Sequence, residues 1–343
     1  MNMKKILLTI LLAMPLAASA YDFMVGGVAY KVISLSDLTC EVTKGCQPKS
    51  GKLKIPAEVI YEGRIFKVLG IGDGGVADYL SIRELVIENG PTYIGESAFF
   101  GQEFDEIVIP PSINTIRSFA FSSNKLSVLT FSYSDEPLSA VSGWAFARTT
   151  ISTLYLLRPV VEGTIPDILS NSVENFVIGE KVRRIGERDA PLFGMSNLKR
   201  LEIGMRLREL PDLHEGEYLE YIAIFSMRPP VAHGFSERTK MKTTLYVPVG
   251  AKEIYEKANI WKEFWHIEEH EQLTPCMPNV PDINQDDKIG QKDFTALVDY
   301  IMGKKPENVT PVTADVNYDG KVNIADIVSL TDVYRKLLEE AGK

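Results

Sequence analysis

The chain has 343 residues, of which 45% are hydrophobic and 24% are charged, so it can bury a large core. Its formal net charge of -9 at pH 7 argues against nucleic-acid binding, because phosphate contacts need clustered Lys and Arg. No stretch after residue 20 is long and apolar enough for a membrane-spanning helix. We therefore expect a protein of more than one domain that binds no nucleic acid and spans no membrane.

Residues 1–20 have the layout of a secretory signal peptide. Lys4 and Lys5 precede an apolar run over 6–16, and small residues at 18–20 precede Tyr21. Because Tyr rather than Cys follows the expected cleavage point, a lipid anchor is disfavoured. We expect an exported protein that is secreted, on the cell surface or periplasmic.

Residues 21–50 are expected to form an N-terminal cap in which 21–23 and 27–32 pair as a hairpin. Cys40 and Cys46 lie close together, and an oxidising compartment would permit a disulfide, but the sequence leaves that pairing open. The third cysteine, Cys276, is predicted to be an isolated thiol, because no His stands at a position typical of a catalytic pair.

Two apolar residues separated by one position recur along the middle of the chain. The couplets are Leu85/Ile87, Ile107/Ile109, Leu129/Phe131, Leu154/Leu156, Phe176/Ile178, Leu201/Ile203, Ile222/Ile224 and Leu245/Val247. Their first members are 22, 22, 25, 22, 25, 21 and 23 residues apart. Such a period is typical of a solenoid whose repeats each bury one strand face against their neighbours.

A second apolar column has the same period. Its members are Ile71, Ile94, Ile116, Val141, Ile185 and Leu210. Together the two columns predict a solenoid over 51–270, with short parallel strands and irregular or helical returns. The last unit differs: a helical stretch over 250–258 is followed by Trp261, Phe264 and Trp265, which we expect to close the far end of the core.

Three segments resemble the BspA-like leucine-rich repeat proteins exported by gut and oral Bacteroidetes. They are Ile-Gly-Glu-Ser-Ala-Phe at 94–99, Val-Ile-Pro-Pro-Ser-Ile-Asn-Thr-Ile at 108–116, and Leu-Tyr-Val-Pro-Val-Gly at 245–250 with Trp261 downstream. The resemblance covers residues 21–270, and the later repeats depart from it because they lack Ala-Phe after Ile165 and Leu210. It implies a leucine-rich repeat solenoid in a surface or secreted binding protein.

Residues 271–281 contain three prolines and are expected to be a semi-stiff linker. Beyond it, residues 315–326 carry oxygen side chains at loop positions 1, 3, 5, 9 and 12 with Gly at 6, the layout of a calcium loop. A weaker copy begins 33 residues earlier, with Asp287 replacing the turn Gly and Gly290 at position 9, where a water would complete the shell. The expected ligands are Asp315, Asn317, Asp319, Lys321 through its carbonyl, Asn323 and Asp326, and then Asp282, Asn284, Asp286, Lys288 through its carbonyl and Asp293.

Each loop runs into an apolar helical stretch, at 294–301 and 327–334, with no good helix before it. This tandem, with Asp at position 12, resembles the type I dockerin domain over residues 282–343. The resemblance implies a small α-helical domain ordered by two calcium ions that docks onto a cohesin-like or other protein. The pairs at loop positions 10 and 11, Gln291-Lys292 and Ile324-Ala325, differ from the Ser-Thr pairs of cellulosomal dockerins, which disfavours a cellulosome-type partner.

Two motifs suggest enzymes but fit the repeats better. Residues 70–75 match a dinucleotide fingerprint, yet only about eight residues separate them from the next strand, too few for a βαβ crossover helix. Residues 266–270 match an H-x-x-E-H zinc-protease string but lie where the repeats end, and we expect a solvated charged stretch. Paired carboxylates for glycoside hydrolysis stay open, because 46 acidic residues offer many candidates.

The residue between the members of each couplet should face out of the sheet. Exposed aromatic side chains there are candidates for stacking on a sugar or anchoring a protein. The expected ligand surface is Tyr155 and Tyr246 from these positions, with Leu157, Tyr221 and Phe225 from flanking outward positions, unless these side chains only pack on one another or on a neighbouring loop. We expect a non-enzymatic adhesion protein that binds a host or bacterial surface protein or glycan. The alternatives are a carbohydrate-recognition accessory of a polysaccharide-degrading system and a hydrolase with an unrecognised site.

Overall fold

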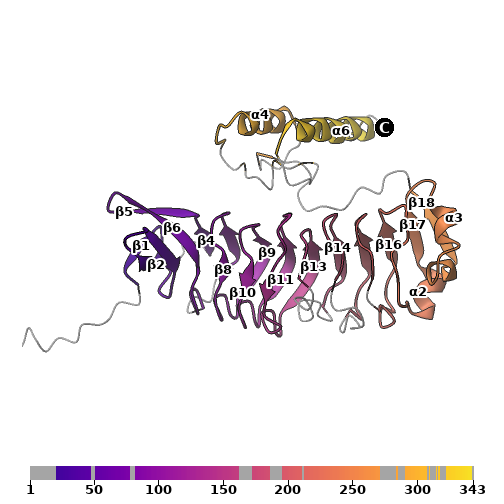
Figure 1. The fold of residues 1–343 in the computed structure, drawn as a ribbon, viewed down its shortest axis with the longest axis horizontal. Helices are drawn as coiled ribbons and strands as arrows, with labels where there is room; N and C mark the ends of the chain where they lie inside the picture. Colours follow the sequence, from indigo (N-terminus) through magenta and orange to yellow (C-terminus); the bar gives the residue numbers. More distant parts are fainter. Residues whose placement is uncertain are drawn as a thin grey trace, which may run out of the picture.

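A computed structural model describes residues 21–47, 51–77, 82–161, 172–185, 195–210, 212–270, 283–284, 290–306, 309, 314, 316 and 322–341. Within residues 21–270, short strands stack along an elongated solenoid (Figure 1). The predicted signal peptide, the predicted linker and Cys276 lie outside the described residues.

Ten strands form the long sheet, whose neighbours are all parallel. They are β4 (Lys52–Ile55), β7 (Glu84–Ile87), β9 (Glu103–Ile109), β11 (Lys125–Phe131), β13 (Thr150–Leu156), β14 (Asn175–Ile178), β15 (Arg200–Ile203), β16 (Tyr221–Ile224), β17 (Thr244–Val247) and β18 (His266–Glu269). Leu129 pairs with Ile107 on one side and Leu154 on the other, so the couplets lie in register. All couplet side chains are at most 7% exposed. The predicted solenoid is confirmed.

The second sheet begins as hairpins and continues as short parallel rungs. Its strands are β1 (Phe23–Val25), β2 (Val28–Ser34), β3 (Thr39–Val42), β5 (Glu58–Tyr61), β6 (Arg64–Ile71), β8 (Tyr93–Ile94), β10 (Thr115–Ile116) and β12 (Ala140–Val141). The expected hairpin is present, because β1 pairs antiparallel with β2. From β3 onward the main path through β6, β8, β10 and β12 is parallel, so Ile71, Ile94 and Ile116 stack in one buried column.

The Ala-Phe motif supplies the middle of the core. The rings of Phe99 and Phe121 stack with centroids 5.3 Å apart, and those of Phe121 and Phe146 stack at 5.1 Å. Each phenylalanine follows a fully buried alanine, whose small side chain leaves room for the neighbouring turn. One residue type at one repeat position therefore builds a continuous aromatic column.

The far end of the solenoid is closed by α2 (Glu237–Lys242), α3 (Lys252–Tyr255) and the 3-10 helix η1 (Trp261–Glu263). Trp261 is buried and donates its indole N–H to the Pro230 carbonyl at 2.7 Å, and Phe264 is buried beside it. The prediction was wrong for Trp265, which is 68% exposed. Trp265 leads directly into β18, where successive side chains point to opposite faces, so only one of the two adjacent aromatics can face inward.

Arg158 joins three turns from inside the protein. Its guanidinium is fully buried and donates from Nη1 to the carbonyls of Pro111 at 3.1 Å and Ile113 at 2.8 Å. Nε and Nη2 donate to the Glu136 carbonyl at 3.3 and 3.0 Å. Desolvation lowers the pKa of Arg158 to about 10, which leaves the group charged at neutral pH.

Candidate functional site: a calcium module, a tyrosine ladder and a polar pocket

The C-terminal module is built on two helices, α4 (Gln291–Ile301) and α6 (Ile324–Ala341). Its buried hydrophobic side chains among the described residues are Ile283, Ala296, Leu297, Ala314 and Leu330. The rings of Phe294 and Tyr334 meet edge-on at 5.8 Å and link the two helices. The described part of this core is small, and a domain of about sixty residues rarely gains enough stability from its core alone.

The last residue of each predicted calcium loop is a fully buried aspartate. Asp293 Oδ1 accepts backbone N–H bonds from Ile283 at 2.7 Å and Asn284 at 3.2 Å, and its Oδ2 accepts one from Gly290 at 2.8 Å. These bonds bring the two ends of the first loop together. Asp326 Oδ2 likewise accepts from the Asn323 N–H at 2.8 Å.

This arrangement fits a calcium ion, because a loop that wraps a cation must bring its first and last oxygen ligands to one point. Asn284, Asp293, Asn323 and Asp326 supply the carboxylate and amide oxygens that a hard cation prefers. The other predicted ligands lie outside the described residues: Asp282, Asp286, Lys288, Asp315, Asn317, Asp319 and Lys321.

Two of the predicted ligand-surface residues meet on the outward face of the long sheet. Tyr221 on β16 and Tyr246 on β17 have ring centroids 5.1 Å apart. The Arg200 guanidinium lies 3.7 Å above the Tyr221 ring, and His270 meets the Tyr246 ring edge-on at 5.7 Å. The buried Glu202 carboxylate binds Arg200, with Oε1 at 2.6 Å from Nη2. We call Arg200, Glu202, Tyr221, Tyr246 and His270 the tyrosine ladder.

Tyr155 and Leu157 belong to a separate cluster with Tyr133. Leu157 is only 4% exposed, so the expectation that it offers a ligand surface is wrong. Its outward position is covered because neighbouring side chains pack over the sheet: Lys181 lies 5.1 Å from the Tyr133 ring and pairs with Asp135 at 2.7 Å. Phe225 directly follows β16, is half-buried, and stays a predicted contact.

The H-x-x-E-H string occupies β18 rather than a helix. His266 and His270 are four positions apart along extended chain, so their Cα atoms are about 13 Å apart, too far for both to bind one metal ion. Among the residues that the structure describes, no group of three or more His, Cys, Asp or Glu could hold a metal.

The glycines of the fingerprint-like segment allow close packing within the second sheet. A Cβ atom on Gly70 would lie 2.6 Å from the Tyr93 ring, and one on Gly72 would lie 3.0 Å from the Glu41 carboxyl carbon. Gly70 therefore leaves space for the Tyr93 side chain, and Gly72 leaves space for that of Glu41. No nucleotide is needed to explain them.

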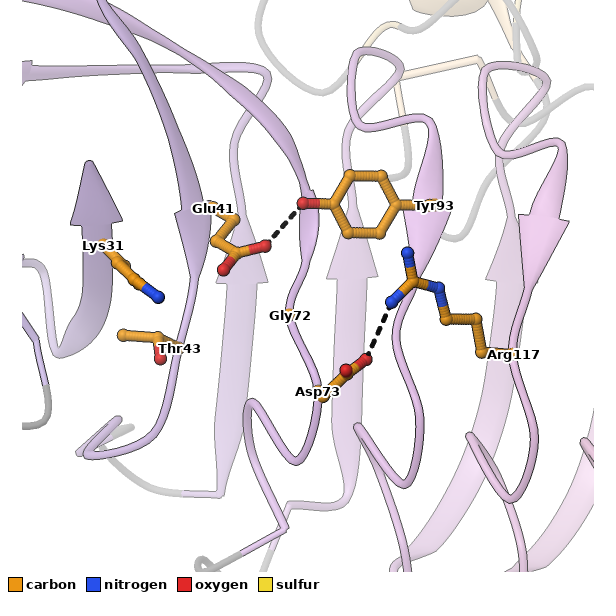
Figure 2. Close-up of a pocket in the computed structure, with 7 residues that line it drawn as sticks. All are labelled: Lys31, Glu41, Thr43, Gly72, Asp73, Tyr93 and Arg117. Atoms are coloured by element: carbon orange, nitrogen blue, oxygen red, sulfur yellow. Dashed lines mark hydrogen bonds and ion pairs between the residues drawn. The ribbon is translucent and has the colours of Figure 1, made fainter. Parts of the chain in front are cut away.

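Those two side chains line a polar pocket that sequence analysis missed. It encloses about 300 Å³ and is lined by Lys31, Glu41, Thr43, Gly72, Asp73, Tyr93 and Arg117. Figure 2 shows Tyr93 and Arg117 on one side and Lys31, Glu41 and Thr43 on the other. The Tyr93 hydroxyl donates to Glu41 Oε2 at 2.5 Å, and Arg117 Nη1 lies 3.2 Å from Asp73 Oδ1. The paired glycines were the signal for it in the sequence.

Cys40 and Cys46 are both buried free thiols. Burial, with a smaller contribution from Glu41, raises the pKa of Cys40 to about 12, and burial raises that of Cys46. Protonated thiols are poor nucleophiles. Both cysteines therefore act as small core residues in this state.

Comparisons with known families agree with both parts of the architecture. A model of the BspA type leucine rich repeat region matches residues 70–199 in six copies, and a model of the dockerin type I domain matches residues 280–332. The chain joins BspA-type leucine-rich repeats to a type I dockerin. The dockerin match includes both predicted calcium loops, and dockerins of this type bind calcium. Both resemblances seen in the sequence are confirmed.

Solved structures similar to the chain include two leucine-rich proteins and a vaccine antigen. A leucine-rich repeat protein from Bacteroides ovatus is 14% identical, with 68% of this chain and 81% of that chain covered and a TM-score of 0.25. A leucine rich cell surface protein from Faecalibacterium prausnitzii is 13% identical, with 73% and 95% covered and a TM-score of 0.22. The pneumococcal vaccine antigen PcpA is 12% identical, with 73% and 98% covered and a TM-score of 0.26. Scores this low carry no functional argument.

A comparison with curated proteins found no match. Within the described residues, no helix has both the length and the apolar character needed to cross a membrane. BspA-type repeats and dockerins are typically non-catalytic modules.

Proposed function

We propose that this chain is an exported, non-enzymatic binding protein. Its repeats hold a protein partner through the tyrosine ladder, and its dockerin attaches the chain to a cohesin-type module. The coarse role, protein interaction or adhesion without catalysis, follows from the two kinds of domain. The export step rests on the signal-like residues 1–20.

The contact between Tyr221 and Tyr246 carries the proposal. Tyrosine and arginine are enriched among the residues that dominate protein interfaces, because they bury a large area and keep a polar group for hydrogen bonding. Here two half-buried tyrosines and an arginine stand on three adjacent parallel strands. The ion pair with Glu202 and the ring contacts hold Arg200 and Tyr221 in place before any partner arrives, which lowers the entropy lost on binding.

In the dockerin, we propose that calcium is held by the eleven ligands predicted from the two loops. Asp293 and Asp326 would supply carboxylate oxygens, and Asn284 and Asn323 side-chain amide oxygens. The bound ion supplies positive charge that draws the loop oxygens together. The buried aspartates also hold backbone N–H groups, so they fix each loop against its helix.

Replacing both Tyr221 and Tyr246 with Ala is expected to weaken capture of the protein partner about tenfold or more, the effect typical of central interface residues. The wild-type chain and the variant would be immobilised and exposed to cell-surface protein extract in EDTA, so that only calcium-independent binding is measured. Captured proteins would be quantified by mass spectrometry. Because both rings are half-buried, the variant should unfold within a few degrees of the wild type.

Tyr218→Ala is the matched control, since Tyr218 is exposed and is not part of the ladder. It should capture as much partner as the wild type. Equal capture by all three proteins would rule out the ladder as the binding site. A large fall in the melting temperature of the double variant would mean that the tyrosines are core residues.

A further inference from the structure

The charges around the polar pocket balance. Two basic residues, Lys31 and Arg117, and two acidic residues, Glu41 and Asp73, line it. Lys31 and Glu41 are directly opposite each other on β2 and β3. Asp73 follows β6 and Arg117 follows β10, so their ion pair spans the intervening rung of β8. A ligand in this space therefore meets both signs of charge within a small volume.

The pocket also presents both hydrogen-bond donors and hydrogen-bond acceptors. Burial, and then the bond to Glu41, raises the pKa of Tyr93, so its hydroxyl stays a donor. That bond uses Glu41 Oε2, and Asp73 Oδ1 receives Arg117 and the Glu96 N–H at 2.8 Å. Each carboxylate has a second oxygen for a ligand, and Lys31 makes no ion pair with any residue in the described ranges.

These groups select the chemistry of the ligand. An anion would face Glu41 and Asp73, and an amine would face Lys31 and Arg117, so each would meet like charge. A neutral hydroxyl group can donate to a carboxylate and accept from an ammonium at the same time. The lining is almost wholly polar and therefore excludes an apolar ligand.

We infer that this pocket binds one neutral sugar unit of a glycan. About 300 Å³ lies at the lower end of the range for small-molecule sites, which suits a single ring. Arg117 and Asp73 come from the repeats, whereas Lys31 and Glu41 come from the N-terminal hairpins. The site is thus formed where the cap meets the solenoid. It adds a second ligand to the proposed function and is independent of the tyrosine ladder on β15 to β18.

Binding of glucose, galactose, mannose and N-acetylglucosamine to the full chain would be measured by saturation-transfer NMR in calcium buffer, with glucuronic acid and glucosamine as charged probes. At least one neutral sugar should bind, and Lys31→Met should weaken it about tenfold, the effect of one charge-assisted hydrogen bond. Asp73→Asn, which keeps the side-chain shape, should also weaken it. Lys67→Met removes an exposed lysine of β6 outside the pocket and should bind as the wild type does.

Three results would overturn the inference: binding of none of the neutral sugars, binding of the charged probes only, or equal binding by wild type and Lys31→Met. Loss of sugar binding in the Tyr221→Ala/Tyr246→Ala variant but not in Lys31→Met would place the sugar on the ladder instead. Since Lys31, Lys67 and Asp73 are all exposed, their three variants should have the melting temperature of the wild type. A sugar result of either kind leaves the capture experiment on the protein partner unaffected.

Discussion

Replacing Asp326 with Ala is expected to unfold the dockerin while the repeats stay folded. The change removes the proposed last ligand of one calcium loop and leaves the Asn323 N–H without its buried acceptor. A ligand present at a thousand times its dissociation constant stabilises a fold by about 4 kcal/mol. A core of this size cannot offset the loss of that stabilisation. Loss of the amide signals of residues 322–341 in NMR spectra, with those of the repeats unchanged, would be the expected observation.

Asp299→Asn is the control for this experiment. Asp299 lies on α4 outside both loops and pairs at the surface with Lys304 at 2.7 Å, so its replacement should cost at most about 1 kcal/mol. If Asp326→Ala kept a folded dockerin in calcium, the aspartate would not be a ligand that matters for folding. Unfolding of the repeats in the same variant would mean that the two parts do not fold separately.

Replacing Arg158 with Met is expected to destabilise the repeats by about 3 kcal/mol, because the carbonyls of Pro111, Ile113 and Glu136 lose their donors. Methionine fills most of the volume but donates no hydrogen bond. For a domain of this size, the melting temperature should fall by about 6–12 °C. Differential scanning calorimetry of the full chain would measure the shift in the transition of the repeats.

Arg208→Met provides the comparison, since Arg208 is exposed in the same domain. Its melting temperature should stay within about 2 °C of the wild type, as is usual for surface substitutions. A similar melting temperature for Arg158→Met and Arg208→Met would show that water, not Arg158, satisfies the three carbonyls.

The repeat part of the fold could be predicted because one pattern is used many times. Every couplet side chain, from Leu85 to Val247, faces the same core. A repeat whose own residues fit the pattern poorly can therefore still be assigned from the spacing of the repeats on either side. The Ala-Phe motif is equally informative, since Phe99, Phe121 and Phe146 must stack if the rungs are in register. In the dockerin, the loop spacing placed Asp293 and Asp326 at the starts of helices, where the structure has them.

Features that depend on contacts between rungs could not be predicted in the same way. Leu157 occupies an outward position, yet Tyr133 and Tyr155 pack against it. Arg158 sits beside it in the sequence and looks like a surface residue until the carbonyls of Pro111, Ile113 and Glu136 are known to surround its guanidinium. The polar pocket joins Lys31 to Arg117 across 86 positions of sequence, and no local periodicity relates them.

Hydrogen–deuterium exchange of the full chain with calcium and with EDTA tests the central claim most directly, namely that calcium orders the dockerin and leaves the binding solenoid untouched. We predict faster exchange in EDTA for peptides from residues 282–343 and unchanged exchange for peptides from residues 51–270. Faster exchange throughout the repeats, or no change in the C-terminal peptides, would contradict the account.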